Sequence, residues 1–327
     1  MISSLPVSVV VPTRNSAATI VSCLRSILDV LPPDASEVVV VDGGSTDDTQ
    51  RLVGALPVTL AKVDPCFVAR SRNFGVERTH HPLVLFVDSD CTVDGAWFRA
   101  IQETFANQNI GIVGSRYALR PMPSWVETAW DRAHRRPPEP LIAHTVYVPG
   151  GNLAVRREVF DLVRGFDERM ETGEDADLCA RVRESGYWVV DHAQMTCVHH
   201  GEPRTLTSVY RRNRWHGRGA RLRYSNGRVA PIMLATLAFA CGLGVGFTSI
   251  ALAVVGGISP PTSMVLAPIL VPAAYAARYA KPPRLTHVAQ LLAVYSAYFL
   301  GRACALPAVA ERVWRERVAV AMRTWRQ

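Results

Sequence analysis

Two carboxylates separated by one residue, Asp88 and Asp90, directly follow the apolar run Leu83–Val87. Two like charges this close are unfavourable unless a cation neutralises them. Mg²⁺ prefers one or two carboxylates together with phosphate oxygens, so the pair suits a divalent cation that carries a nucleoside diphosphate. A solvated turn after a strand, where Asp and Ser are common, accounts for the same residues when they are taken alone.

Polar loops also follow two earlier apolar runs. Residues 7–11 lead into the loop 12–15, and residues 37–41 lead into the acid and two glycines of 42–44. Ligands of parallel α/β sheets bind beyond the carboxyl ends of the strands. We therefore expect these two loops and the acidic pair to converge on one cleft.

The segments between the loops must position them. Short apolar runs alternate with segments whose apolar residues recur at helical spacing. This alternation predicts an α/β fold with a mostly parallel sheet and helices on both faces. The predicted strands are 7–11, 37–41, 57–63 and 82–87, and the predicted helices are 16–30, 46–56 and 67–79. Neither G-x-G-x-x-G after the first strand nor G-x-x-x-x-G-K-[ST] occurs, which argues against a Rossmann dinucleotide site and a P-loop.

Composition bounds the class of protein. The chain has 327 residues and a net charge of +8, and its length suggests about two units. Seven cysteines without C-x-x-C spacing argue against a disulfide framework or a zinc site and fit a reducing cytosol. The N-terminus has no charged n-region or apolar h-region, so we expect no cleaved signal.

Eight arginines and no acid lie between residues 204 and 228. Such a cluster suits anionic lipid, phosphate or nucleic acid.

The C-terminal third is strongly apolar. Residues 229–257 contain no charge and are long enough to span a bilayer. Residues 258–277 form a second uncharged stretch, so we expect a helical hairpin that turns near 256–262. Basic residues flank the hairpin on both sides, which by the positive-inside rule predicts that the N-terminal half lies in the cytoplasm, at the inner membrane. This position before a membrane span makes lipid or phosphate, and not nucleic acid, the expected partner of the arginines.

A third apolar stretch, 285–310, contains His287, Gln290 and Arg302. It is either a third span or a re-entrant or interfacial helix, and both alternatives stay open. The tail 311–327 alternates Arg with apolar residues and predicts a basic amphipathic helix on an anionic leaflet. The expected domains are thus 1–226, with a basic linker from about 204, then the membrane region 227–310 and the tail 311–327. A helical core in a large soluble domain is the alternative for the whole region.

Three further motifs lie between residues 149 and 215. Paired glycines in Pro149-Gly150-Gly151-Asn152 allow close backbone approach to a ligand. Gly165-Phe166-Asp167-Glu168 precedes Gly173-Glu174-Asp175-Ala176-Asp177-Leu178, which opens a predicted helix. Acids in that position either interact with the helix dipole or supply a general base. His199-His200 and Arg211-Arg212-Asn213-Arg214-Trp215 come last.

This ordered set of motifs resembles the family 2 inverting glycosyltransferases of GT-A fold. The resemblance runs from about Val7 to Trp215 and includes P-T-x-N, V-D-G-G-S-T-D-D-T, D-S-D, G-G-N, G-F-D-E and G-E-D-A-D-L. The later residues 216–221 are similar to membrane-associated exopolysaccharide members. The resemblance implies a GT-A catalytic domain followed by C-terminal transmembrane helices.

The resemblance also implies roles for individual residues on the donor side. The donor nucleoside would be held by Pro12, Thr13, Asn15 and Asp42. The diphosphate or ribose would lie near Arg70, Arg72 and Asn73. Asp90 would be the main ligand of Mg²⁺ or Mn²⁺, and Asp88 would contact the sugar or ribose beside the metal. His199 or His200 would bind metal or phosphate, with a purely structural histidine as the alternative.

On the acceptor side, the resemblance implies a base and a binding surface. Asp175 would be the catalytic base, and Glu174 would contact the acceptor. The donor sugar and acceptor pocket would be lined by Gly150, Gly151 and Asn152. Arg214 would contact phosphate and Trp215 would stack on the acceptor. Arg211 stands where the processive polymerases of the family carry Gln, which argues against processive synthesis.

These features together predict metal-dependent transfer of a sugar, with inversion, from a nucleotide sugar to a hydroxyl of a polyprenyl-linked saccharide. UDP is the commonest donor nucleotide of the family, and membrane lipids and polysaccharide-assembly proteins are the expected partners. Two alternatives stay open. One is transfer to a polyprenyl phosphate, and the other is a non-catalytic membrane scaffold with a degenerate nucleotide-sugar domain.

Overall fold

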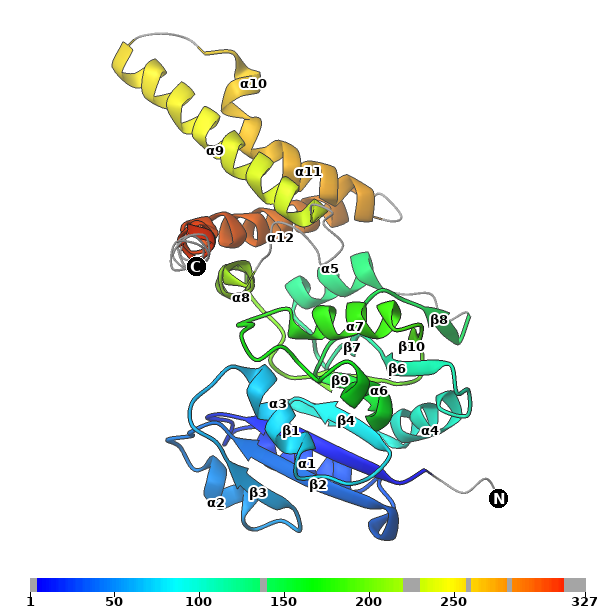
Figure 1. The fold of residues 1–327 in the computed structure, drawn as a ribbon. Coiled ribbons are helices and arrows are strands. Elements are labelled where there is room, and N and C mark those ends of the chain that lie inside the picture. The colour runs from blue at the N-terminus through cyan, green and yellow to red at the C-terminus, as the bar shows by residue number, and fades with distance from the viewer. Residues whose placement is uncertain (1–4, 136–139, 220–229, 257–259, 281–283, 315–327) are drawn as a thin grey trace, which may run out of the picture. The chain divides into compact units, whose positions relative to one another are not determined.

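The computed structural model describes residues 5–135, 140–219, 230–256, 260–280 and 284–314 (Figure 1). Contacts divide the chain into two compact units. The first comprises residues 1–121 and 136–202, and the second comprises residues 122–135 and 203–327. Residues 122–135, which lie within the catalytic motifs along the sequence, therefore belong to the same unit as the apolar C-terminal helices.

An eight-stranded sheet forms the centre of the first unit. Its strand order is β3-β2-β1-β4-β9-β6-β10-β8. The strands are β1 (Val7–Thr13), β2 (Ser36–Asp42), β3 (Thr59–Lys62), β4 (Leu83–Val87), β6 (Ile110–Gly114), β8 (Ile142–His144), β9 (Asn152–Arg156) and β10 (Trp188–His192). Six strands run in one direction, while β9 is antiparallel to both of its neighbours and β8 is antiparallel to β10. The mixed α/β sheet confirms the predicted fold class.

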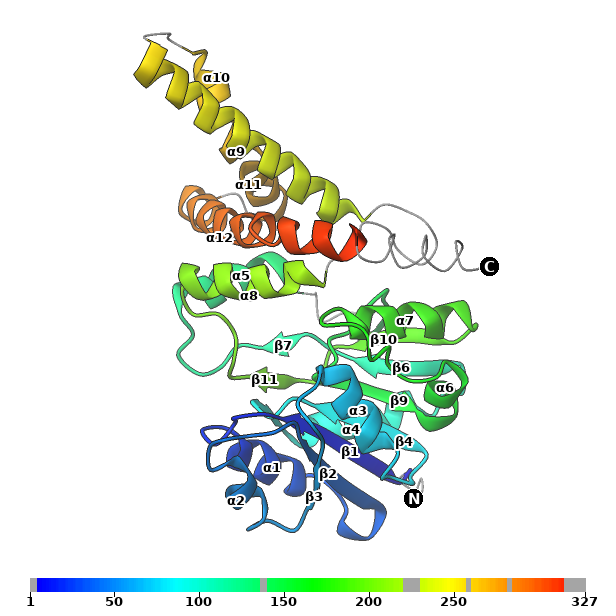
Figure 2. The same ribbon diagram turned by 60° about the vertical axis from the view of Figure 1, so that its left-hand side comes forward.

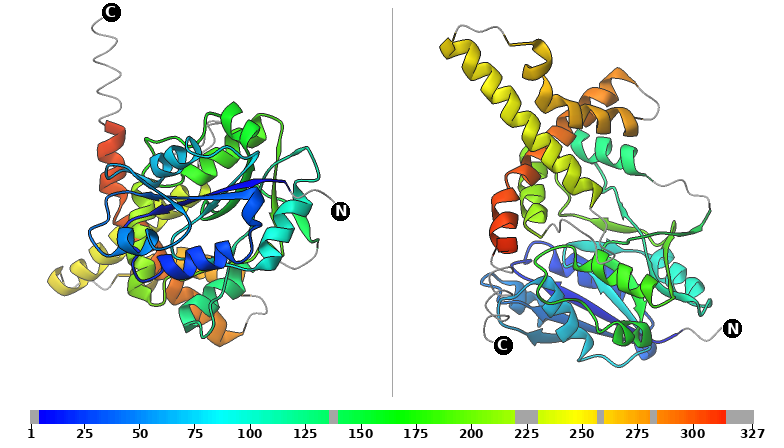
Figure 3. Two further views of the ribbon diagram at one scale, coloured as in Figure 1. Left: turned by 90° about the horizontal axis from the view of Figure 1, so that it is seen from below. Right: turned by 45° about the horizontal axis from the view of Figure 1, so that its top comes forward.

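Helices cover both faces of this sheet, as the alternation of patterns predicted (Figure 3, left). They are α1 (Ile20–Leu28), α2 (Thr49–Val53), α3 (Val68–Val76), α4 (Gly95–Thr104), α6 (Arg157–Leu162) and α7 (Glu174–Glu184), with a 3₁₀ turn at Pro33–Ala35. Successive side chains of a strand point to opposite faces. Val9 and Val11 therefore join the core under α1 and α4, whereas Val10 joins the core under α3, α6 and α7.

The first strand is longer than predicted, because it continues through Pro12 to Thr13. A proline cannot donate to a ladder and is tolerated where a neighbour is missing. The pairing of β1 with β4 ends at Val10, so beyond that point β1 pairs only with β2. The polar end of β1 thereby stays open on the side of β4.

A small second sheet lies beside the carboxyl end of β4 (Figure 2). Its order is β5-β11-β7, with β5 (Cys91–Val93), β11 (Cys197–His199) and β7 (Tyr117–Ala118). His199 pairs with Cys91 across β11 and β5. This register brings the histidine next to the acidic pair, although 109 positions separate His199 from Asp90.

The second unit is helical. It contains α5 (Trp125–His134), α8 (Leu206–Arg218), α9 (Pro231–Gly256), α10 (Thr262–Val265), α11 (Ala267–Tyr279) and α12 (Leu285–Ala303). Among the described residues, two helical segments are long and apolar enough to cross a membrane, Pro231–Val255 and Leu285–Trp314. Most of the predicted basic tail, residues 315–327, lies outside the described residues.

The second span expected over 258–277 is not one continuous helix in the described residues. It is divided at Leu266 into α10 and α11. Pro268 stands in the first turn of α11, where its missing N–H costs nothing, and it cannot continue the hydrogen bonds of a preceding helix. The 13 residues of α11 rise about 20 Å, short of the roughly 30 Å of the hydrocarbon core.

Candidate active site

The ends of β1 and β2 form a polar recess. Thr13 and Asp42 are paired in register, and both are buried. One carboxylate oxygen of Asp42, Oδ2, accepts hydrogen bonds from Gly44 N (3.2 Å), Ser45 N (3.0 Å) and Gln50 Nε2 (2.8 Å). The other, Oδ1, and the Thr13 hydroxyl are buried without a hydrogen-bond partner among the described residues. Buried polar atoms are costly when unpaired, so these two atoms are the ones in the recess whose hydrogen-bonding capacity is unused.

Asn15 ties the two loops of this recess together. Its backbone is left-handed, with φ of 53°. Its amide oxygen accepts a hydrogen bond from Thr46 N (2.8 Å), and its own N–H donates to Ser45 Oγ (2.8 Å). Pro12 is a buried strand residue. The structure thus brings all four predicted nucleoside residues to one place, and Asn15 shapes the loops there.

Asp90 is paired with His199. Their Oδ1 and Nε2 atoms are 3.2 Å apart, and the other ring nitrogen of His199 lies 3.3 Å from Glu202 Oε1. Burial alone would lower the pKa of His199, but hydrogen bonds and charge interactions with Asp90 and Glu202 raise it to about 10. The ring of Tyr117 stacks on His199, with centroids 4.5 Å apart. The ring of His200, by contrast, hydrogen-bonds to Thr92 (3.0 Å), so His199 is the histidine beside the acidic pair.

These residues fit a divalent cation. Ligand atoms of Asp90, Cys91 and His199 lie within 4.8 Å of one another. A hydrogen bond with Cys197 and burial raise the pKa of Cys91 well above its usual range, so this thiol stays neutral and is a poor ligand for a hard ion. Asp90 therefore supplies the carboxylate oxygen that Mg²⁺ and Mn²⁺ prefer. His199, whose raised pKa keeps its ring protonated beside Asp90 and Glu202, would bind the ion only after it loses a ring proton.

Arg72 connects the acidic pair to the start of α7. Its guanidinium is buried and donates from Nη2 to Asp88 Oδ1 (2.8 Å) and from Nη1 to Glu174 Oε1 (2.6 Å). Burial and the neighbouring Asp175 raise the pKa of Glu174, against the opposing effect of Arg72. Arg72 and Glu174 thus face each other in the interior of the first unit.

Two other predicted site residues on α3, Arg70 and Asn73, have different surroundings. Asn73 donates to Phe166 O (2.9 Å) and accepts from Phe166 N (3.0 Å). Both ends of this amide are therefore occupied in holding the G-F-D-E segment. Arg70 is exposed.

Asp175 is held by three hydrogen bonds. Its Oδ2 accepts from Tyr147 Oη (3.1 Å) and Gly150 N (3.0 Å), and its Oδ1 accepts from Ala176 N (2.8 Å). Asp175 is the second residue of α7, which follows the left-handed Gly173 (φ 83°). The carboxylate is half-buried, so its orientation is defined while it stays accessible to a substrate hydroxyl.

The paired glycines are packing positions. A Cβ atom on Gly150 would lie 2.7 Å from Arg72 Nη1. A Cβ atom on Gly151 would overlap the Asp88 carboxylate and lie 2.6 Å from the Tyr117 hydroxyl. These contacts exclude any side chain at the turn between Asp88 and Asp175.

Asn152, the third residue of this motif, faces the core. It is fully buried and accepts from Trp97 Nε1 (2.8 Å). Its amide nitrogen donates to Ser115 O and Met195 O, both at 3.0 Å. All its hydrogen-bonding groups are occupied, so it positions the loop and does not line a sugar pocket.

Sequence reasoning missed several residues of this site. Tyr147, Tyr117 and Trp97 carry no local motif, whereas Glu202 lies three residues after His199 and could have been found as a neighbouring acid. The remaining predicted residues, Arg214 and Trp215, are exposed on α8 of the second unit.

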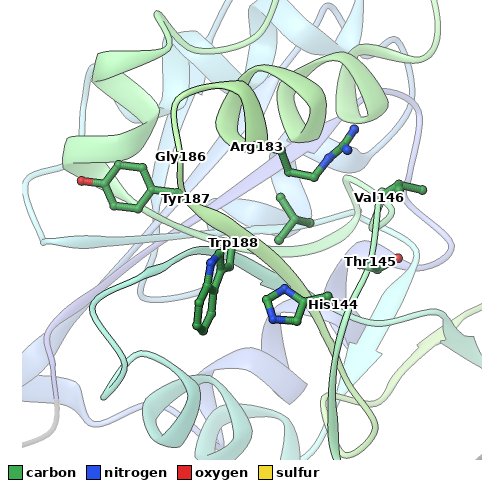
Figure 4. Close-up of a pocket in the computed structure, with 8 residues that line it drawn as sticks. His144, Thr145, Val146, Arg183, Gly186, Tyr187 and Trp188 are labelled. Carbon is green, nitrogen blue, oxygen red and sulfur yellow. The ribbon is translucent and has the colours of Figure 1, made fainter.

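A cavity of about 590 Å³ lies at the β8 edge of the sheet (Figure 4). None of the predicted site residues lines it. Its lining residues are His144, Thr145, Val146, Arg183, Gly186, Tyr187, Trp188 and Val189. Val146 immediately precedes Tyr147, so the same loop borders this cavity and holds Asp175.

Comparisons with known proteins agree with this geometry. Residues 8–163 match the model of glycosyl transferase family 2. The glycosyltransferase AglE of Haloferax volcanii is 26% identical over 196 residues, which cover 57% of this chain and 64% of AglE. The pre-mycofactocin glycosyltransferase of Mycobacterium tuberculosis is 29% identical over 193 residues, which cover 55% of this chain and 39% of that protein. The match therefore extends over less than two thirds of either relative.

Among solved structures, the mannosyltransferase PcManGT from Pyrobaculum calidifontis, in complex with GDP-Man and Mn²⁺, shares the fold. The TM-score is 0.57 at 22% identity, with 91% of this chain and 88% of that chain covered. The family match and the shared fold agree with the convergence of the D-S-D, G-G-N and G-E-D motifs in one unit. Residues 8–163 thus carry a glycosyl transferase family 2 domain, and the mixed α/β sheet resembles the GT-A fold.

Proposed function

We propose that this protein transfers a sugar, with inversion, from a nucleotide-sugar donor to a hydroxyl of a lipid-linked saccharide at the cytoplasmic face of a membrane. The observation that carries the proposal is the turn at Gly150 and Gly151. Gly150 donates to Asp175, and Gly151 packs against Asp88. The proposed base, Asp175, and Asp88 of the acidic pair are thus next to the two consecutive glycines of one turn.

In the proposed reaction, Asp175 accepts the proton of the acceptor hydroxyl as its oxygen attacks the anomeric carbon. The bond from that carbon to the diphosphate breaks, and the nucleoside diphosphate leaves with the bonding electrons. Asp90 and His199, with Asp88 beside them, would hold Mg²⁺ or Mn²⁺, whose charge offsets the charge that develops on the leaving group. A single displacement inverts the anomeric centre, so an α-linked donor gives a β-linked product.

Thr13 and Asp42 would bind the donor nucleoside. Their unpaired buried atoms, the hydroxyl and Oδ1, lie at adjacent strand ends and would be satisfied by polar groups of a base or ribose. UDP is the nucleotide that the family resemblance favours. GDP is the nucleotide of the PcManGT complex, so both belong in the first test.

We infer the chemical class of the acceptor from the second unit. The uncharged α9 and the surrounding arginines suit a bilayer, where a polyprenyl-linked saccharide would be presented to the site and polysaccharide-assembly proteins would act on the product. The three hydrogen bonds that orient Asp175 favour a hydroxyl acceptor, because a polyprenyl phosphate is already ionised and needs no base.

The decisive experiment measures release of nucleoside diphosphate from UDP- and GDP-sugars by protein purified in detergent. We expect release that requires Mg²⁺ or Mn²⁺ and is abolished by a chelator. Polyprenyl diphosphate-linked sugar should raise the rate, and polyprenyl phosphate should not. Failure to turn over any nucleotide sugar with metal present would favour a non-catalytic scaffold.

A further inference from the structure

The two helices α5 and α8 form the charged layer of the second unit. α5 carries Glu127, Asp131 and Arg132, and α8 carries four arginines. These charges are partly paired, since Arg204 just before α8 lies 3.7 Å from Glu127 and Arg135 pairs with Asp131 (2.5 Å). Both helices begin with a capping box, at Ser124 and at Thr205, so their N-termini are defined.

α12 packs directly against this charged layer. The hydroxyl of Tyr295 hydrogen-bonds to the ring of His134 on α5 (3.0 Å). The ring of Tyr298 stacks on Trp130 of α5, with centroids 5.9 Å apart. Contact with α8 is closer still, because a Cβ atom on Gly217 would lie 2.6 Å from the Cβ of Ala305. These contacts extend from the middle of α12 to beyond its end.

The other side of α12 packs against the apolar layer, α9 and α11, in which the single charged residue is Arg278 in the last turn of α11. Phe299 lies 5.8 Å from Phe239 of α9 and 4.9 Å from Tyr275 of α11, measured between ring centroids. α9 has no charged residue. The C-terminal half of α9 exposes large apolar side chains, with Phe247 69% and Val255 88% exposed. This layer suits hydrocarbon.

α12 therefore lies at a boundary in polarity, between α5 and α8 on one side and α9 and α11 on the other (Figures 1 and 2). If α12 crossed the bilayer, the helices packed on its middle and end would carry their charges into hydrocarbon, which is strongly unfavourable. Composition alone allows a span over Leu285–Trp314, but the packing of α12 decides against it.

We propose that α12 is an interfacial helix, which lies along the surface of a phospholipid bilayer with both of its ends on the side of α5 and α8. This inference rests on the membrane association in the proposed function. In this arrangement α9 enters the bilayer from the side of α5 and α8, and the chain returns to that side through α10 and α11.

Aromatic side chains support this position. Exposed tryptophans occur on α5 (Trp125, 46% exposed), on α8 (Trp215, 43%) and after α12 (Trp314, 66%). Tryptophan is enriched where hydrocarbon meets headgroups. Arg302 in α12 lies with its guanidinium 5.6 Å from the ring of Tyr298. An arginine at the interface keeps its charged end among water and headgroups while its stem packs on apolar surface.

Cysteine labelling in sealed membrane vesicles tests the inference. The background variant replaces the thiols of Cys66, Cys241 and Cys304 and keeps the four buried cysteines. Thr207→Cys on α8 and Trp314→Cys beyond α12 are then introduced separately, both at exposed positions. A membrane-impermeant maleimide is applied to right-side-out and to inside-out vesicles. We expect both cysteines to react in the same vesicle orientation.

Reaction of the two cysteines in opposite orientations would show that α12 spans the bilayer and would overturn the inference. Val313→Cys, a second exposed position near the same end, gives the same reading if Trp314→Cys does not accumulate. Release of the protein by alkaline carbonate would refute membrane insertion and the inference with it. Nucleoside diphosphate release in detergent tests the transferase reaction separately, so the two failures are distinguishable.

Discussion

Gly151 lies so close to Asp88 that a Cβ atom on the glycine would overlap the carboxylate and come within 2.6 Å of the Tyr117 hydroxyl. We expect Gly151→Ala to displace Asp88 and to lower the rate of sugar transfer by about 100-fold, because errors of about 1 Å in catalytic geometry have effects of this size. Steady-state rates with the preferred donor measure it. Gly95→Ala is the matched control, since nothing lies within 4 Å of its added Cβ. Equal rates for the two variants would refute the packing role.

Asp175→Asn preserves the shape of the side chain but removes the base. We expect sugar transfer to fall roughly 10²- to 10⁴-fold, with the affinity for nucleoside diphosphate and Mn²⁺ unchanged in calorimetric titration. Asp177→Asn, on the same helix and paired with Arg181 (2.9 Å), is the control and should retain activity. Near-full turnover by Asp175→Asn would mean that another group is the base.

The variant Thr13→Val distinguishes an effect on nucleotide affinity from an effect on the melting temperature. The hydroxyl of Thr13 has no hydrogen-bond partner among the described residues, so its removal should leave the melting temperature unchanged or higher. Loss of one hydrogen bond to the donor, about 1 kcal/mol, should weaken nucleotide binding several-fold. Thr59→Val at an exposed position of β3 is the control for both measurements. A lower melting temperature with unchanged binding would contradict the assignment.

Arg72→Met leaves Asp88 and Glu174 without their shared counter-charge. Removing one partner of a buried ion pair costs roughly 3–5 kcal/mol. Urea unfolding followed by tryptophan fluorescence, to which buried Trp97 contributes, should therefore shift to clearly lower denaturant. The double variant Arg72→Met with Glu174→Gln should recover part of this loss, because one uncompensated charge is removed. Arg51→Met, whose partner Asp48 is on the surface, should unfold at the same urea concentration as the original chain.

The sequence allowed the strand ends to be predicted because short apolar runs define where strands stop. Asp42 and the Asp88–Asp90 pair were identified in this way, and the structure brings them into one unit. The surroundings of Glu174, Asn73 and Asn152 could not be predicted in the same way. Their partners lie 102, 93 and 55 positions away along the chain, so only the folded structure shows that they face inward.

The choice between His199 and His200 also depended on long-range pairing. Adjacent residues of a strand point to opposite faces, and the register of β11 with β5 directs His199 toward Asp90. No local pattern distinguishes the two histidines. The unit to which α5 belongs could not be predicted either, because the amphipathic pattern of a helix does not show which surface its apolar side covers.

The assignment of residues 122–135 to the second unit has a practical consequence for expressing the first unit alone. The chain passes between the two units three times, after residues 121, 135 and 202. A fragment cut at Glu202 would keep α5 but lose α12, and would uncover Val126, Ala129 and Trp130. Such a fragment would tend to aggregate. A soluble catalytic fragment therefore requires a second excision, in which a short polar linker replaces residues 122–135.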